Sequence, residues 1–278
     1  MSYYEVLGLK QEPFSTSPDP AFFYRSLSHN AALQRLEILV RLKRGLGLIL
    51  GDVGVGKTTM SRALLQSFTN EHDYIFHIML DPSYKSEFQF LESLVKMFGL
   101  KPASRSTLDY REEIERYLFK KGVDEHKTVV LLIDEGQKLS SPFLEILRTV
   151  LNYETNEYKL LQLVIVAQME LLPRIKKIKN FYDRIGLKYI INPLDEKETK
   201  EMVLFRLNQA GLEDPDLGYP DPRRRSLCRG DGQEASHQVL GNRRVSQEGR
   251  DHLPGDPPGL QDRSEKTPVF GRWRDQGN

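Results

Sequence analysis

The chain has 278 residues, of which 39% are hydrophobic and 28% are charged, and its formal net charge is +1. The composition is typical of globular proteins, and the balanced charge excludes a global field that would draw the chain to nucleic acid or to an acidic membrane. A single cysteine, Cys228, excludes a disulfide framework and a cysteine-based zinc cluster. Without a signal-peptide pattern or an apolar stretch of ~20 residues, we expect a cytoplasmic protein with no membrane span.

Short apolar runs alternate with amphipathic segments along most of the chain. Strands are expected at 46–50, 74–80, 128–133, 160–167 and 188–191, and helices at 28–44, 57–68, 86–98, 108–121, 142–153, 170–178 and 195–210. Such alternation predicts an α/β fold, with a parallel sheet that is covered by helices on both faces and binds ligands at the carboxyl ends of its strands.

The composition changes near Leu217. Residues 218–278 contain one Lys, ten Arg and no Ile, whereas thirteen Ile precede them. The segment has few apolar residues, and their burial cannot offset the entropy cost of ordering the chain. The tail, residues 214–278, is therefore predicted to be disordered. The change also resembles a coding sequence translated out of frame. We therefore hypothesise a frameshift near Leu217, which sequencing the gene would test.

A glycine-rich motif follows the first expected strand. Residues 51–58, Gly51-Asp52-Val53-Gly54-Val55-Gly56-Lys57-Thr58, fit the phosphate-loop pattern G-x-x-x-x-G-K-[ST], and Thr59 completes the candidate site. The glycines let backbone N–H groups face a phosphate at the N-terminus of the next helix. Lys57 is expected to bridge the β- and γ-phosphates and Thr58 to bind Mg²⁺. The alternative is a glycine-rich turn with an incidental lysine.

Two acidic residues follow the apolar strand expected at 128–133. Asp134 is a candidate ligand of Mg²⁺, directly or through water, and Glu135 is a candidate base that orients and deprotonates an attacking water. An acidic pair at a strand end can also cap a helix. Together with the phosphate loop, however, the pair favours nucleotide hydrolysis. Asp81-Pro82, at the end of the second expected strand, is interpreted as a turn.

Five passages resemble the AAA+ ATPases of the general secretion pathway protein A (ExeA-like) type, which are related to the ATPase helper subunits of some transposons. They are YYEVLGLKQEPFSTSPDPAFFYRSLSHNAAL, GDVGVGKTT, LLIDEGQKLSSPFLEILRTVLNYET, KLLQLVIVAQMELL and YDRIGLKYIINPLDEKET. The resemblance implies a P-loop AAA+ core at 1–194 and a truncated helical lid at 195–213. It ends near residue 212, and no counterpart of the family's lid arginine follows. We therefore expect an open adenine side and slow hydrolysis.

The resemblance also implies roles for single residues. Lys57 and Thr58 would bind phosphate and metal, Asp134 metal, and Glu135 the attacking water. Gln168 matches a sensor that positions this water against the γ-phosphate, although it can also be an exposed polar strand end.

An arginine finger is a further expectation from the resemblance. Arg184 matches an arginine that reaches the γ-phosphate of a neighbouring subunit, which implies a homo-oligomer, either a ring or a filament. Arg174 competes for this role, and either residue can instead be a solvated surface arginine.

Three further features have two interpretations each. Tyr24 and His29 lie where an aromatic ring could stack on adenine, but core packing is an equal alternative. The basic run at 174–179, RIKKIK, could contact DNA phosphates or form a solvated helix face.

The leading functional hypothesis is an ATPase that binds ATP, hydrolyses it with Mg²⁺ and acts as a motor or switch in protein secretion, on a protein partner that the sequence does not identify. The alternatives are an ATP-dependent, DNA-associated transposition helper and a catalytically weak nucleotide-binding scaffold.

Overall fold

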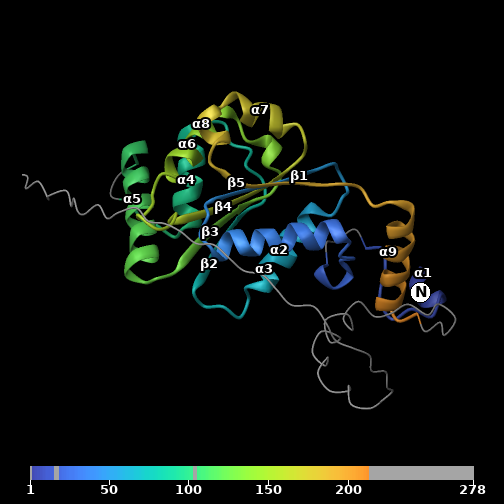
Figure 1. Cartoon of the computed structure of the whole chain (residues 1–278). Helices are drawn as coiled ribbons and strands as arrows, with labels where there is room; N and C mark the ends of the chain where they lie inside the picture. The colour runs from blue at the N-terminus through green and yellow to red at the C-terminus, as the bar shows by residue number, and fades with distance from the viewer. Residues whose placement is uncertain (1, 16–18, 103–104, 213–278) are drawn as a thin grey trace, which may run out of the picture. The chain divides into compact units, whose positions relative to one another are not determined.

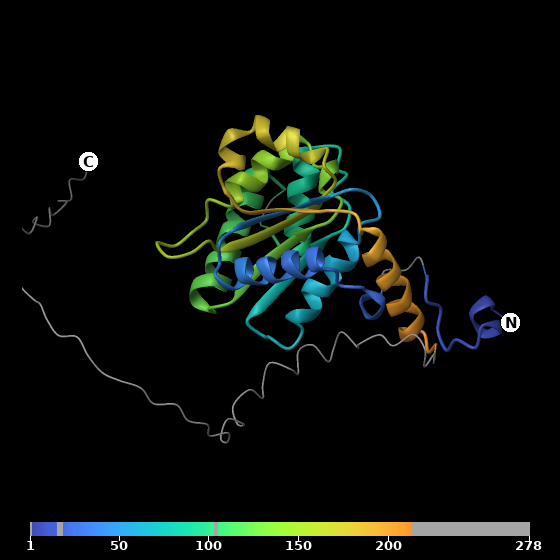
Figure 2. The same ribbon diagram turned by 45° about the vertical axis from the view of Figure 1, so that its right-hand side comes forward.

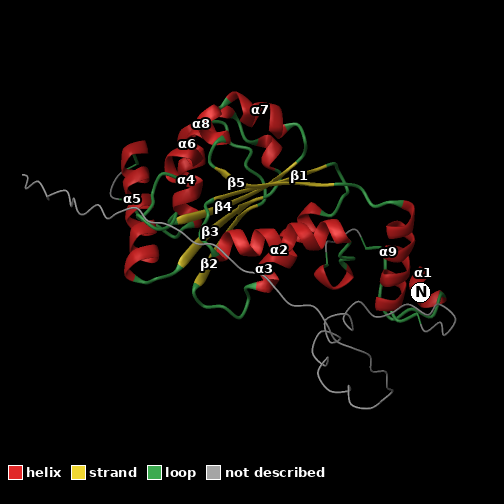
Figure 3. Cartoon of the chain, in the orientation of Figure 1, coloured by secondary structure: helices red, strands yellow, loops and turns green. Residues whose placement is uncertain are grey.

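A parallel sheet runs through the centre of the protein (Figures 1 and 3). The computed structural model describes residues 2–15, 19–102 and 105–212. The strands are β1 (Leu46–Gly51), β2 (Tyr74–Met79), β3 (Thr128–Ile133), β4 (Leu161–Ala167) and β5 (Ile185–Ile191). They pair in the order β2-β3-β4-β1-β5, and each neighbouring pair is parallel. The predicted sheet type is therefore confirmed.

Helices cover both faces of this sheet (Figure 1). One face carries α2 (Leu27–Arg41) and α3 (Lys57–Ser67). The other face carries α4 (Glu87–Met97), α5 (Thr107–Phe119), α6 (Ser141–Val150), α7 (Leu171–Lys177) and α8 (Lys179–Tyr182). The remaining elements are α1 (Tyr3–Val6), α9 (Glu196–Gln209), the 3₁₀ turns η1 (Pro20–Phe22) and η3 (Gly136–Lys138), and η2 (Lys120–Asp124), which is a π-helical turn after α5.

The uncharged sequence of β3 follows from its burial on both faces. Val129, Leu131 and Ile133 pack in the cluster under α4, α5 and α6, whereas Val130 and Leu132 pack in the cluster under α2 and α3. All six residues of the strand are buried. Because successive side chains point to opposite faces, a strand between two helical layers must be apolar at every position.

The sheet order brings three strand ends together. β4 lies between β3 and β1, and the register pairs Ile133 with Ile165 and Leu50 with Ala167. The residues that follow these parallel strands therefore emerge at one edge of the sheet. These are the glycine-rich loop after β1, the acidic pair after β3 and Gln168 after β4.

The N-terminal segment packs against the last described helix. Leu9, Phe22 and Ala210 form a small buried cluster. The backbone N–H groups of Lys10 and Gln11 both donate to the Ala210 carbonyl, at 2.7 and 3.3 Å. Figure 2 shows α9 outside the layers that flank the sheet, with α1 farther out beyond it. Asp195 caps α9 by accepting a hydrogen bond from the Glu198 N–H at 2.7 Å.

The structure corrects several predicted boundaries. β5 starts at Ile185 rather than 188, and its side chains alternate between partial burial and exposure because it is an edge strand. The expected helix at 170–178 corresponds to α7, and the short helix α8, which was not predicted, follows it after Ile178, where φ and ψ are −102° and 77°. The predicted tail, residues 214–278, which includes Cys228, lies outside the described residues. None of the described helices is long and apolar enough to cross a membrane.

Candidate functional site

The glycine-rich loop joins β1 to α3 and has the backbone of a phosphate cradle. Gly54 and Gly56 have φ values of +81° and +86°, a region in which residues with side chains are strained. Gly51 is required for a different reason, since an added Cβ would lie 2.9 Å from both the Ile191 carbonyl oxygen and Val55 Cγ2. α3 starts at Lys57, so its unpaired N–H groups open toward the loop. The loop geometry therefore suits an anionic ligand.

Lys57 is held inside this loop. Its Nζ donates to the Gly51 carbonyl at 3.1 Å and to the Asp52 carbonyl at 2.6 Å, and the residue is only 9% exposed. Burial lowers the pKa of the Lys57 ammonium, while the negative charges of Glu135, Asp134 and Asp52 act in the opposite direction. An ammonium has three donors, so Lys57 can bind ligand oxygens as well as a loop carbonyl.

The acidic pair lies at the carboxyl end of β3, on the same edge as the loop. Asp134 is 4% exposed, and its Oδ1 accepts a hydrogen bond from the Glu135 N–H at 2.9 Å. Glu135 itself has a φ of +53°, which is uncommon for a residue other than glycine. Non-glycine residues in this region cost of order 1–3 kcal/mol and cluster at functional sites. The negative charges of both carboxylates oppose the lowering of the Lys57 pKa by burial.

Mg²⁺ fits this arrangement only together with a ligand. Among the described residues, no group of three or more His, Cys, Asp or Glu side chains is close enough to hold a metal ion. Mg²⁺ in phosphate-binding sites usually takes one or two protein oxygens, with the other positions filled by phosphate and water. Thr58 at the start of α3 and the nearly buried Asp134 can supply such oxygens.

Gln137 connects the acidic pair to the end of β4. The sequence patterns did not predict this connection. The Nε2 of Gln137 donates to Glu135 Oε2 at 2.6 Å, and its Oε1 accepts from the Gln168 backbone N–H at 3.1 Å. Its own carbonyl accepts from Arg174 Nη1 at 2.8 Å. The only available signal in the sequence was a polar residue two positions after the acidic pair. Gln168 thus lies beside the site, joined to it through its backbone.

The two candidate arginine fingers are placed differently. Arg174 donates to the Gln137 and Leu139 carbonyls, so it is bound within its own chain. Arg184, after α8, donates to the Asn180 carbonyl at 2.5 Å and to Asn152 Oδ1 at 2.7 Å on an exposed surface. In the basic run, Ile175 is buried, whereas Lys176, Lys177 and Lys179 are exposed.

A cavity of about 360 Å³ opens beside the loop, with three parts of the chain in its wall. The N-terminal segment supplies Phe23, Tyr24 and His29, the loop supplies residues 53–56 and Thr59, and α9 supplies Thr199, Met202 and Arg206. His29 is buried and braces the loop, since its ring nitrogens lie 2.8 Å from Ser26 Oγ and 2.7 Å from the Val55 carbonyl. Tyr24 donates to Glu201 Oε2 at 2.5 Å. Both predicted aromatic residues therefore line this cavity.

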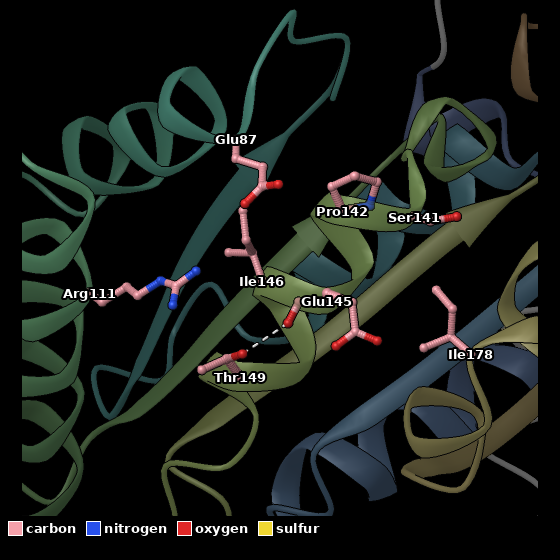
Figure 4. Close-up of a pocket in the computed structure, with 8 residues that line it drawn as sticks. All are labelled: Glu87, Arg111, Ser141, Pro142, Glu145, Ile146, Thr149 and Ile178. Atoms are coloured by element: carbon pink, nitrogen blue, oxygen red, sulfur yellow. Dashed lines mark hydrogen bonds between the residues drawn. The ribbon is translucent and has the colours of Figure 1, made fainter.

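A second cavity, of about 460 Å³, lies in the helical layer on the other face of the sheet (Figure 4). Its wall carries charges of both signs, including Glu87, Arg111 and Glu145. Glu145 is paired with Arg148 at 2.6 Å, and Arg111 extends from α5 toward the space below Glu87. None of the predicted site residues lines this cavity.

Comparisons with known proteins agree with this geometry. A family described as an AAA domain matches residues 40–175. The chain is 34% identical over 215 residues to the general secretion pathway protein A of Aeromonas hydrophila. This match covers 77% of the chain, but the chain spans only 39% of that relative.

Solved structures share the fold at low identity. The ORC2 protein of Aeropyrum pernix, solved as ADPNP–ADP complexes, has a TM-score of 0.54 at 15% identity. The match covers 71% of this chain and 55% of the ORC2 chain. The Cdc6p of Pyrobaculum aerophilum has a TM-score of 0.52 at 20% identity, with the same coverage. At these identities the likeness concerns the fold alone. Since the domain match and the relative agree, residues 40–175 form an AAA domain, and the chain is a nucleotide-binding homologue of general secretion pathway protein A.

Proposed function

We propose that this chain binds Mg-ATP at the loop between β1 and α3 and hydrolyses it. The observation that carries the proposal is the convergence of a buried lysine, a buried aspartate and a glutamate with a left-handed backbone at one edge of the sheet. β4 separates β1 from β3 by one strand, so the loop after β1 and the acidic pair after β3 emerge close together. A lysine, an aspartate and a glutamate around a glycine-rich loop are typical of sites that bind and hydrolyse nucleoside triphosphates.

The proposed roles follow from the chemistry of each side chain. Backbone N–H groups of residues 51–59 bind the phosphates, and Lys57 exchanges at least one of its two loop carbonyls for phosphate oxygens. Thr58 and Asp134 hold Mg²⁺, which neutralises charge on the phosphates when it is bound. Glu135 accepts a proton from the attacking water through the carboxylate oxygen that Gln137 does not occupy.

The proposed biological role is that of a motor or switch in protein secretion, and the named relative is the support for it. In this proposal, Arg184 reaches the site of a neighbouring copy in a homo-oligomer, because its exposed position lets it exchange surface partners for a phosphate. A role on DNA is less favoured, since the net charge is only +1 and the most basic run has an arginine turned inward.

The experiment separates binding from hydrolysis. We expect Lys57→Ala to weaken Mg-ATP binding at least about tenfold, because charge-assisted hydrogen bonds to phosphate are lost. Glu135→Gln should keep binding but lower the rate of phosphate release by about 100-fold or more. Isothermal titration calorimetry and a phosphate-release assay measure the two effects.

Two exposed residues of the same types provide matched controls. Lys176→Ala and Glu157→Gln should behave like the wild type. If Glu135→Gln released phosphate at the wild-type rate, hydrolysis at this site would be refuted. If the wild type bound no Mg-ATP, the whole proposal would fail.

A further inference from the structure

Arg174 is the one member of the basic run that bonds to the turn after the acidic pair. It lies on α7 and is partly buried, and its Nη1 donates to the Gln137 carbonyl at 2.8 Å and to the Leu139 carbonyl. A terminal guanidinium nitrogen carries two hydrogens, so it can serve both carbonyls at once. Arg174 therefore connects α7 to the turn η3.

The turn η3 has few hydrogen bonds of its own. The Lys138 N–H donates to the Glu135 carbonyl at 2.9 Å, and the Leu139 N–H donates to the Gly136 carbonyl at 3.0 Å. Neither bond uses the two carbonyls that Arg174 binds. Short 3₁₀ turns have poor hydrogen-bond geometry, and the last carbonyls of a helical turn lack partners inside it. The contacts with Arg174 thus supply donors that the turn itself does not have.

The same turn carries the side chain that orients Glu135. Gln137 donates to Glu135 Oε2 at 2.6 Å and accepts from the Gln168 N–H at 3.1 Å. Glu135 has a φ of +53°, and a strained residue keeps its conformation only when its surroundings fix it from several directions. Because Arg174 holds the Gln137 backbone, it also fixes the position from which the Gln137 amide reaches Glu135.

We propose that Arg174 is a positioning residue for hydrolysis, which holds η3 in place and thereby aims Glu135 through Gln137. The inference rests on the proposed hydrolysis at Glu135. Arg174 acts here inside its own subunit, in contrast to an arginine finger, and it does not line the cavity beside the loop. Its loss should therefore slow the chemical step and leave nucleotide binding unchanged.

The first test is the split between kcat and KM. Phosphate release is measured over a range of Mg-ATP concentrations for the wild type, Arg174→Met, Arg174→Lys and Lys177→Met. We expect Arg174→Met to lower kcat about tenfold, as for the loss of a charge-assisted hydrogen bond, with KM within twofold of the wild type. Arg174→Lys keeps a cationic donor and should recover part of this loss. Lys177 is an exposed lysine of α7, and its variant should match the wild type.

The second test asks whether Arg174 acts through Gln137. Residues that work as one unit give losses that do not multiply. The double variant Arg174→Met with Gln137→Ala should therefore have a kcat within twofold of the slower single variant. Losses that multiply, a wild-type kcat for Arg174→Met, a loss confined to KM, or no recovery in Arg174→Lys would overturn the inference.

Mixing two inactive variants separates positioning from a role at a neighbouring subunit. An equimolar mixture of Arg174→Met and Glu135→Gln should release phosphate only at the sum of the two separate rates. Recovery above that sum would overturn the inference, because the Glu135→Gln copies still carry the arginine for a neighbour's site. The Glu135→Gln variant alone tests the proposed function. A wild-type rate for it would refute hydrolysis at this site, whereas a slow Glu135→Gln with a normal Arg174→Met would refute only the positioning role.

Discussion

Removing the Gln137 side chain tests how Glu135 is held. In Gln137→Ala, Glu135 loses the donor at 2.6 Å, and the Gln168 N–H loses its acceptor at 3.1 Å. Glu135 already has a strained backbone, with φ at +53°, so its carboxylate depends on side-chain contacts for its direction. We therefore expect the variant to bind Mg-ATP normally and to hydrolyse it more slowly.

The size of the effect follows from the bond that is lost. A hydrogen bond to a charged group contributes about 1.5–3 kcal/mol. If that energy serves only to orient the base for the attack on phosphate, kcat falls by about 10- to 100-fold. KM should stay unchanged, because Gln137 does not line the cavity beside the loop. Steady-state phosphate release over a range of ATP concentrations measures both constants.

Two further variants separate orientation from folding. Gln137→Glu keeps the shape of the side chain but cannot donate to Glu135, so its kcat should fall as far as that of the alanine variant. Gln66→Ala removes an exposed glutamine of α3 and should have wild-type constants. A kcat of Gln137→Ala within twofold of the wild type, or a loss that appears only in KM, would contradict the positioning role.

Two predictions concern stability. In Gly136→Ala, the new Cβ would lie 2.5 Å from Ile165 Cγ2 and 3.3 Å from the Val166 carbonyl oxygen, so we expect a loss of about 1–3 kcal/mol in urea unfolding; a change below 0.5 kcal/mol would show that β4 adjusts freely. For His77, burial lowers the pKa of the folded state, so the unfolded chain binds the proton first, near pH 6.5. The free energy of unfolding should therefore fall as the pH drops below about 6.5, and His77→Asn should reduce this dependence; identical pH profiles for variant and wild type would exclude His77 as its cause.

The sequence predicted the sheet where burial leaves a simple pattern. β3 is buried on both faces, and its predicted range of 128–133 agrees with the structure. β5 was predicted three residues too short, because Gly186 interrupts the apolar pattern among the missed residues 185–187. The short helix α8 was missed, because four residues do not give a helical repeat.

The candidate site was predictable where chemistry follows local spacing. The glycine loop and the pair Asp134-Glu135 each occupy a few consecutive residues after an apolar strand. Gln137 and Arg206 could not be assigned in this way. The role of Gln137 depends on the Gln168 backbone, 31 positions away, and the position of Arg206 depends on which face of α9 meets the N-terminal segment. Such information arises only when distant segments pack together.

The small cluster of Leu9, Phe22 and Ala210 has a practical consequence for the choice of truncation boundaries in this protein. The cavity beside the loop lies between two distant parts of the chain. One wall belongs to the first thirty residues, and another wall belongs to residues 193–206. The cluster and the two hydrogen bonds to the Ala210 carbonyl hold the N-terminal segment against the end of α9. A shortened version that begins at α2 would keep the whole sheet and the glycine loop. It would remove the N-terminal residues that pack against the end of α9.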